Sequence, residues 1–195
     1  VSAYLLDADK TYRVTARWGI RTDTADADGA VTEQSDIDTI GREALESALD
    51  RLTGDIEQVP PMYSALKKDG KRLYELAREG LEVDREPRPV TIHSLTIEQY
   101  DARAPVLRVK CSKGTYVRTL VEDLADGLGT WGHVAALRRL SVGPFDEPGL
   151  VSMEQVEAAA EVDDQALDAL LLPADSALSD WPAVDLNREQ AWYIC

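Results

Sequence analysis

Residues 111–124, "CSKGTYVRTLVEDL", join a strand to a helix and decide how the middle of the chain folds. The alternation over Val106–Ser112 predicts a strand, and the apolar spacing over Tyr116–Leu128 predicts a helix. An arginine in the first helical turn faces the positive end of the helix dipole. We therefore expect a carboxylate or a phosphate beside Arg118. The alternative is an exposed Arg118 next to a Tyr116 that packs on the core.

Strands and helices alternate irregularly along the rest of the chain, which predicts an α+β fold with a mainly antiparallel sheet. Further strands are expected at residues 10–20, 90–97 and 133–145, and further helices at residues 35–52, 73–78, 153–161 and 164–171. The stretch "RTDTADADGA" (21–30) predicts a polar loop outside the core. Pro60–Pro61 excludes a regular element at that point.

Charge is distributed unevenly over the 195 residues, which carry a formal net charge of −15. Residues 60–118 hold 12 basic and 8 acidic side chains, so only this stretch could meet a polyanion without strong repulsion. No apolar run approaches the ~20 residues of a membrane span, and the first 15 residues carry charges where a signal peptide is apolar. We expect a soluble, cytoplasmic protein with no membrane partner.

Metal and thiol chemistry have little support in the sequence. Cys111 and Cys195 lie far apart and lack metal-type spacing, and His93 and His133 are expected to be structural or exposed. The acidic loop at 23–29 lacks the bidentate glutamate of a calcium site. We therefore expect no metal.

Aromatic and guanidinium groups remain as candidates. Tyr12 alternates with Val14, Ala16 and Trp18 on one face of the first strand, and periodicity alone favours a tyrosine that packs on the sheet.

Four segments in order resemble the bacterial tRNA pseudouridine synthase B family. They are "KTYRVTARWGIRTDTADADG" (10–29), "GDIEQVPPMYSALKKDGKRLYELAREG" (54–80), "CSKGTYVRTLVEDLADGLG" (111–129) and "HVAALRRLSVGPF" (133–145). The resemblance implies an enzyme that isomerises the T-loop uridine (position 55) of elongator tRNAs to pseudouridine, without cofactor or metal. It also implies a mixed, mainly antiparallel sheet flanked by helices, with an inserted RNA-contacting segment.

The resemblance implies roles for particular residues. Arg118 would orient the nucleophilic aspartate, and Tyr12 would lie against the target base. Tyr116 and Leu137 would form the uracil pocket, and Asp26 would lie near it. Such a reaction needs a positioned nucleophile and a flipped base held between an aromatic and an apolar face.

One segment of the family pattern is missing. The family nucleophile lies in "G-x-L-D-P-x-A-T-G", and this sequence contains no such segment. We therefore expect an incomplete and inactive chain. Its expected parts are a partial catalytic domain (1–145), an acidic helical end of that domain (146–179) and the start of a truncated RNA-binding domain (180–195).

The basic stretch "KKDGKRLYELAREG" (67–80) has two interpretations. The resemblance implies that Lys67, Lys68, Lys71 and Arg72 contact the T arm of tRNA. The alternative is a solvated helix of mixed charge. We expect a monomer whose partner is tRNA. Two other functions stay open: a tRNA-binding module or RNA chaperone without catalysis, and an acidic interaction protein unrelated to RNA.

Overall fold

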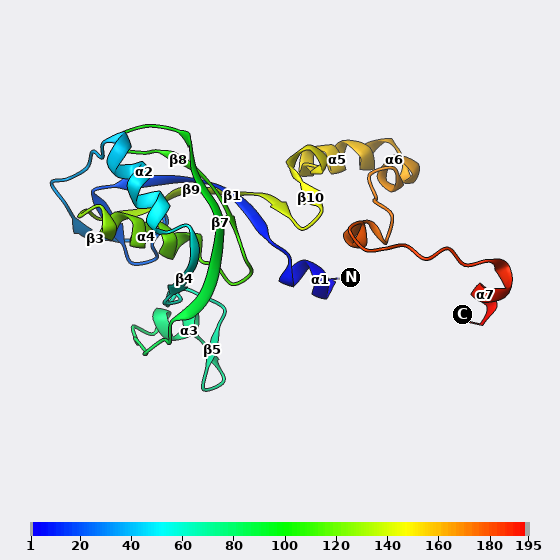
Figure 1. The fold of residues 1–195 in the computed structure, drawn as a ribbon, viewed down its shortest axis with the longest axis horizontal. Helices are drawn as coiled ribbons and strands as arrows, with labels where there is room; N and C mark the ends of the chain where they lie inside the picture. Colours follow the sequence, from blue (N-terminus) through cyan, green and yellow to red (C-terminus); the bar gives the residue numbers. More distant parts are fainter. Residues whose placement is uncertain (1, 194–195) are drawn as a thin grey trace. The chain divides into compact units, whose positions relative to one another are not determined.

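The computed structural model describes residues 2–193, and its elements are drawn in Figure 1. The chain divides into two units. The larger unit comprises residues 7–142. The smaller unit joins the N-terminal residues up to Leu6 to the residues from Gly143 onward.

An antiparallel sheet forms the frame of the larger unit. Its strands lie in the order β9 (Gly132–Val142), β1 (Lys10–Trp18), β8 (Val106–Cys111), β7 (Arg88–Gln99) and β4 (Gly54–Gln58). The expected α+β fold with a mainly antiparallel sheet is confirmed, although β4 was not predicted.

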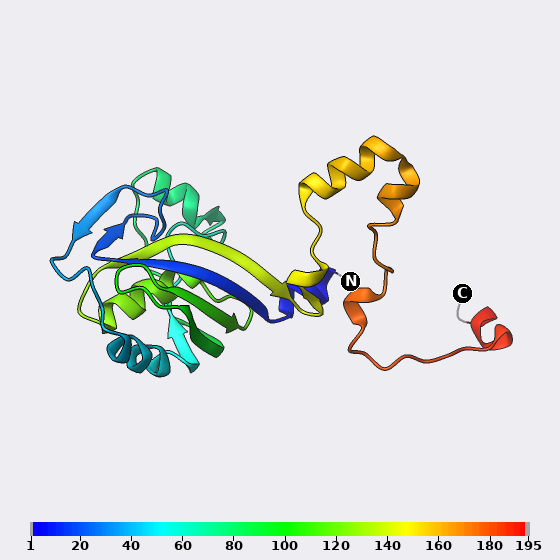
Figure 2. The ribbon, with the colours of Figure 1, turned by 90° about the horizontal axis from the view of Figure 1, so that it is seen from above.

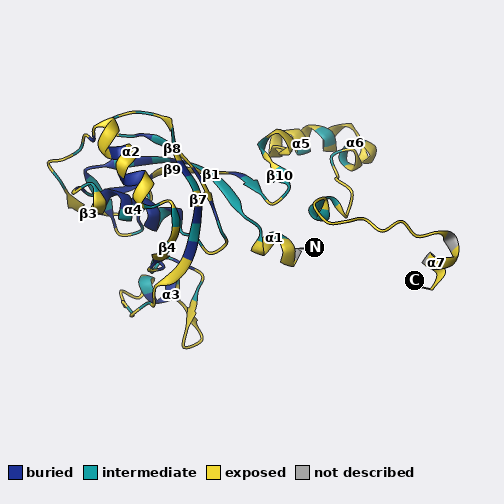
Figure 3. Ribbon diagram, viewed as in Figure 1, coloured by how far each residue is buried: buried dark blue, intermediate teal, exposed yellow. Residues whose placement is uncertain are grey.

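One face of β1 supplies the centre of the core. Val14, Ala16 and Trp18 are at most 1% exposed, whereas Tyr12 at the start of the same row is half-buried. Two helices, α2 (Arg42–Arg51) and α4 (Val117–Gly127), contribute to the same hydrophobic cluster. Figure 3 shows this burial concentrated on the strands and on α4. The alternation and the α4 spacing therefore predicted the core face correctly.

The start of the first long helix was predicted wrongly. We expected a helix from Ser35, but α2 begins at Arg42, and Ile37 is 48% exposed. Backbone hydrogen bonds hold residues 35–40 in an extended path: Ser35 N–H donates to Gly19 C=O (2.8 Å), and Ile40 N–H donates to Ala102 C=O (2.8 Å). These long-range bonds replace the helical ladder.

The acidic loop also differs from expectation, because part of it is buried. It connects β2 (Ile20–Thr22) to β3 (Val31–Gln34). Ala25 is only 3% exposed, and its carbonyl accepts a hydrogen bond from Val134 N–H in β9 (3.0 Å). The loop is thus fixed to the edge of the sheet.

Three small elements follow the Pro60–Pro61 break. Strands β5 (Lys67–Lys68) and β6 (Lys71–Arg72) form a short hairpin, and α3 (Leu73–Arg78) follows directly. The α3 helix has the predicted bounds. The buried residues of α3 are Leu73 and Leu76.

The smaller unit consists mainly of short helices, and Figure 2 shows them in a second view. Its elements from Gly143 onward are β10 (Phe145–Asp146), η1 (Glu147–Gly149), α5 (Met153–Val162), α6 (Asp164–Asp168), η2 (Ser176–Leu178) and α7 (Arg188–Trp192). Helix α1 (Ser2–Asp7) was not predicted, and the division between the two units falls within it, after Leu6. Ser152 and Gln155 form a capping box at α5.

The two helices predicted after Phe145 are present, although α6 ends at Asp168. The expected domain division stays a prediction, and Cys195 lies outside the described residues. Within residues 2–193, the structure contains no helix long and apolar enough to cross a membrane.

Gly132 provides a test of the core packing. A Cβ placed there would lie 2.8 Å from Ala125 Cβ and 2.9 Å from Trp18 Cε3. We expect Gly132→Ala to lower the free energy of unfolding by about 1–3 kcal/mol, because helix and ring must shift. Gly127→Ala is the control, since its Cβ would meet only the flexible end of Arg51 at 3.8 Å. Urea denaturation measures both, and equal stabilities would contradict this packing.

Candidate active site

The start of α4 is held by a residue from another strand. Tyr116 is the N-cap, and its side chain accepts no capping hydrogen bond. Gln58, at the end of β4 and only 2% exposed, instead binds the backbone of this N-cap residue. Its Oε1 accepts from Tyr116 N–H (3.0 Å), and its Nε2 donates to Tyr116 C=O (3.3 Å). The Gln58 amide therefore fixes the backbone from which Tyr116 and Arg118 project.

Arg118 has the carboxylate partner that its position requires. Its Nη1 donates to Asp26 Oδ2 (3.0 Å) and to Thr24 C=O (2.9 Å), and its Nη2 donates to Tyr63 C=O (2.8 Å). The side chains of Arg118 and Asp26 are 23% and 28% exposed. The expectation of a carboxylate at this helix start is confirmed, and the alternative of an unpaired surface arginine is wrong.

Asp26 is itself held in place. Its Oδ1 accepts from Thr24 Oγ1 (2.6 Å) and from Asp28 N–H (3.2 Å), while its carbonyl accepts from Thr22 Oγ1 (2.7 Å). Ala25, next to it, has φ +60°, a value that L-residues with a Cβ rarely adopt. The strained backbone at Ala25 thus lies directly before Asp26, whose carboxylate is held in one orientation by its hydrogen bonds.

Tyr12 and Leu137 lie on neighbouring strands. In the antiparallel pairing of β1 with β9, Val14 lies opposite Leu137 and Tyr12 lies opposite Arg139. Tyr12 and Leu137 are therefore diagonal neighbours on one face of the sheet. Leu137 is 47% exposed, and the Arg139 guanidinium lies 5.5 Å from the Tyr12 ring centroid. Lys10 lies at the start of β1, the strand that carries Tyr12, and burial and the charge of Arg139 lower the pKa of Lys10. The result is an aromatic and apolar surface bordered by cations.

Other groups singled out in the sequence lie elsewhere. Lys113 Nζ pairs with Asp7 Oδ1 at 2.7 Å, and this hydrogen bond lowers the pKa of Asp7. His93 Nε2 lies 3.1 Å from Asp9 Oδ1 on the surface, and buried His133 contacts the Ile20 carbonyl through Nδ1 (2.9 Å). None of these contacts joins the Arg118 cluster.

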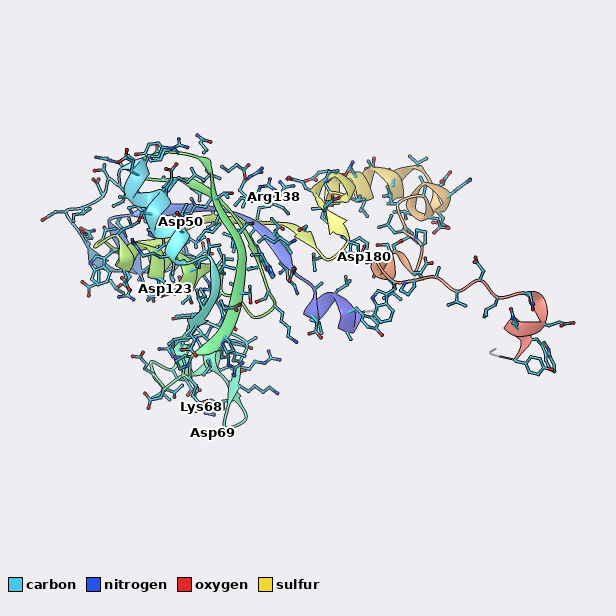
Figure 4. All side chains as sticks on the ribbon, in the orientation of Figure 1. Asp50, Lys68, Asp69, Asp123, Arg138 and Asp180 are labelled. Carbon is cyan, nitrogen blue, oxygen red and sulfur yellow. The ribbon has the colours of Figure 1, made fainter. Side chains whose placement is uncertain are left out.

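The basic stretch begins as a hairpin at residues 67–72, and the helix of the second interpretation is present only over residues 73–78. Asp69 (φ +52°) and Gly70 (φ +85°) form the two-residue turn, as an Asp-Gly pair favours. Figure 4 labels Lys68 and Asp69 at the tip. Lys68 Nζ donates to Asp84 C=O (2.5 Å), and Lys71 lies 3.7 Å from Glu79. The cations are thus exposed on a small projecting element.

The hairpin is connected to the Arg118 cluster through residues 63–66. Leu73 N–H donates to Leu66 C=O (2.8 Å) and Tyr74 N–H to Ser64 C=O (3.1 Å), while the Tyr63 carbonyl accepts from Arg118. Arg72 Nη1 donates to Tyr74 Oη (3.0 Å). The segment that leads into the hairpin is thus bonded to α3 on one side and to Arg118 on the other.

Comparisons with known proteins agree with these features. Residues 1–117 match the model of the TruB family pseudouridylate synthase N-terminal domain, and residues 118–179 match that of the tRNA pseudouridylate synthase B C-terminal domain. The chain belongs to the TruB family. It is 53% identical to tRNA pseudouridine synthase B of Pseudomonas aeruginosa (strain UCBPP-PA14) over 193 residues, and 50% identical to that of Escherichia coli O1:K1 over 200 residues.

The matches cover 98–99% of this chain but 63% of each of those TruB family proteins, so the chain spans less than two thirds of their length. A chain of the crystal structure of a Cbf5–Nop10–Gar1 complex has a TM-score of 0.66 at 20% identity, covering 90% of this chain and 44% of that one. A structure of an H/ACA RNP bound to a substrate RNA containing 2′-deoxyuridine gives 0.62 at 17% identity. These likenesses show that the chain shares the fold of those two chains.

Sequence reasoning missed two residues of this candidate site. Gln58 and the Tyr63 carbonyl lie on either side of the Pro60–Pro61 break in the sequence. Their part in the site is seen only from their contacts with Tyr116 and Arg118 in the folded chain. No local pattern in the sequence marks Gln58, because both its burial and the strand that carries it became visible only in the structure. The individual roles of Arg118, Tyr12, Tyr116, Leu137 and Asp26 in binding or catalysis stay predictions.

We expect Gln58→Leu to lower the free energy of unfolding by about 2 kcal/mol, because Tyr116 N–H loses its acceptor in a buried place. Gln99→Leu, at the exposed end of β7, is the matched control and should change stability little. Urea denaturation followed by circular dichroism compares the two. Equal effects would show that Gln58 does not hold the helix start.

Proposed function

We propose that this chain forms part of a tRNA pseudouridine synthase that isomerises the T-loop uridine of elongator tRNAs. The observation that carries the proposal is the half-buried Arg118 at the start of α4. Within residues 2–193, its Nε–H and second Nη2–H meet no acceptor, while the remaining N–H groups bind Asp26, Thr24 and Tyr63. This edge of the guanidinium could hold a second carboxylate through two parallel hydrogen bonds.

A carboxylate held this way would act as the nucleophile. Arginine keeps it ionised and oriented while the glycosidic bond between C1′ and N1 breaks. The base then turns and rejoins through C5, whose hydrogen is released. Asp26 has a different role, because its two oxygens already accept hydrogen bonds from Arg118, Thr24 and Asp28. It anchors the arginine.

The flipped uracil would lie between the Tyr12 ring and Leu137, next to Tyr116. Stacking on an aromatic face and contact with an apolar side chain suit an unpaired base. The cations of the β5–β6 hairpin would contact phosphates of the T arm. No step of this reaction needs a cofactor. We expect the protein to act as a monomer in the cytoplasm.

A hybrid protein tests the activity. In it, this chain replaces the matching 193 residues of the P. aeruginosa protein, with which it is 53% identical. We expect the hybrid to release tritium from a T-arm stem-loop labelled at C5 of uridine. The 195-residue chain alone should stay at background, because it has no aspartate in an LDP context. A hybrid that binds the stem-loop without turnover would favour an RNA-binding module.

Arg118→Lys in the hybrid separates catalysis from binding. Lysine keeps the charge but cannot make a planar two-point contact with a carboxylate. We expect kcat to fall on the order of 10²-fold or more, with a much smaller change in tRNA affinity. Arg108→Lys is the control, since Arg108 lies on an exposed part of β8 and pairs with Glu98 at 3.4 Å. Near-normal turnover of Arg118→Lys would overturn the role of the arginine.

A salt titration of T-arm affinity tests the hairpin. Each phosphate contact contributes roughly −0.7 to −0.9 to the slope of log affinity against log salt. Replacing Lys67, Lys68, Lys71 and Arg72 by glutamine should weaken binding and flatten this slope by about two to three units. The control makes the same charge change at Arg42, Arg51, Arg103 and Arg108. If both variants bind alike, the hairpin makes no specific contact with RNA.

A further inference from the structure

The segment from Gln58 to Tyr63 is bound at both of its ends to the start of α4. At one end, Gln58 Oε1 accepts from Tyr116 N–H (3.0 Å), and Gln58 Nε2 donates to Tyr116 C=O (3.3 Å). At the other end, the Tyr63 carbonyl accepts from Arg118 Nη2 (2.8 Å). This short segment therefore contacts two residues that the proposed reaction uses, one with each end.

Pro60 and Pro61 make the connection between the two ends stiff. Each proline ring fixes its own φ near about −65° and favours an extended backbone at the residue before it. Pro60 is buried, and its carbonyl accepts a hydrogen bond from Arg85 Nη1 (3.2 Å). The Gln58 amide and the Tyr63 carbonyl are therefore joined by a stretch of chain with little conformational freedom.

The backbone of Tyr116 suits a primary amide as its partner. Tyr116 has an extended backbone (φ −99°, ψ 106°), and the helix begins at the next residue. Its carbonyl already accepts from Leu120 N–H (3.0 Å), so a second donor and an acceptor complete its hydrogen bonds. The carboxamide of Gln58 supplies both from one planar group. A glutamate in its ionised form would supply only the acceptor.

The directions of the Tyr116 and Arg118 side chains depend on this backbone. Tyr116 makes no side-chain capping bond of its own, so the two bonds from Gln58 restrain its φ and ψ. A rotation there changes where the Tyr116 ring points and, two residues later, where the Arg118 side chain starts. Gln58 thus acts on both groups through the backbone.

We propose that Gln58 is a positioning residue for the isomerisation of uridine. Its carboxamide holds the start of α4 so that the Tyr116 ring and the Arg118 guanidinium meet the base and the nucleophilic carboxylate in the reactive geometry. Gln58 touches neither reactant, because it is 2% exposed and its amide binds Tyr116. The inference rests on the proposed function and adds to it a residue that acts through α4.

The loss of this amide should affect the chemical step far more than the binding of RNA. A misplacement of about 1 Å in a positioned group can lower a rate by about 10²-fold. Affinity for RNA comes largely from phosphate contacts, which a local rotation at Tyr116 leaves in place. A fall in kcat with a nearly unchanged Kd is therefore the signature of positioning.

Kinetics of the hybrid with the P. aeruginosa protein test this signature. Gln58→Met keeps the length of the side chain and removes both hydrogen bonds. We expect kcat for tritium release to fall at least about tenfold, and the Kd for the T-arm stem-loop to change less than about threefold. Gln99→Met, at the exposed end of β7, is the matched control and should leave both quantities within about twofold.

Leu49→Ala separates positioning from a general loss of stability. Leu49 lies in α2, outside the candidate site, and is 3% exposed, so its truncation leaves a cavity that destabilises the fold. Circular dichroism identifies a temperature at which all variants of the hybrid are folded. At that temperature we expect Leu49→Ala to keep kcat within about twofold, although its stability is lowered.

A double-mutant cycle with Arg118→Lys tests whether Gln58 acts through α4. Residues of one hydrogen-bonded network have non-additive effects, whereas independent effects on kcat multiply. Arg118→Lys has already lost the two-point contact with the carboxylate. We therefore expect Gln58→Met to lower kcat by less than about threefold in that background, against at least about tenfold in the unaltered hybrid.

Pro61→Gly provides a second variant that leaves Gln58 intact. It breaks no hydrogen bond of its own, because proline has no N–H, and it gives the segment the conformational freedom of glycine. We expect kcat to fall about threefold or more. This variant decides the inference if Gln58→Met does not fold.

The outcomes separate this inference from the proposed function. If the unaltered hybrid turns over and Gln58→Met keeps its kcat, the role of Gln58 is overturned and the proposed function stands. Multiplicative effects in the cycle, or an equal fall in kcat for Leu49→Ala, also overturn it, because the loss would then be one of stability. An unaltered hybrid without turnover overturns the proposed function and this inference with it.

Discussion

The ion pair between Arg118 and Asp26 is the contact on which the arrangement of the candidate site depends. One guanidinium joins the first turn of α4 to the acidic loop and to the carbonyl of Tyr63, which precedes the hairpin in the sequence. The loop is fixed in turn to β9 through Ala25 and Val134. Segments that are distant in the sequence therefore take their positions from one cation. Removing either charge would leave the other in a poorly solvated place.

The sequence predicted well the parts of the fold that local patterns determine. Alternation located β1 and β8, and apolar spacing located α4, because each pattern reflects burial of one face. Long-range backbone bonds defeated the same reasoning at residues 35–40, where apolar spacing predicted a helix that does not form. The Asp69–Gly70 pair was a hairpin signal, but its neighbours are charged, so no apolar alternation marked the strands.

The site was predictable to a similar degree. The electrostatics of a helix start required a carboxylate near Arg118, and the family resemblance drew attention to Asp26. Neither argument indicated Gln58 or Tyr63, because their contacts with α4 exist only after folding. The charge pattern located the basic hairpin. It did not reveal that Lys68 and Lys71 already contact Asp84 and Glu79, contacts that RNA would have to replace.

The contact between Gln58 and Tyr116 bears on how the protein folds. A hydrogen bond between residues of one turn can form in an isolated helix, whereas the bond from Tyr116 N–H to Gln58 needs β4 to meet a helix start 58 residues further along the chain. The first turn of α4 is therefore coupled to loop closure rather than to local nucleation. Arg118 acquires its orientation only as the sheet assembles, so partly folded states with intact helices would still lack the site. Hydrogen exchange at the Tyr116 amide would report on global rather than local opening.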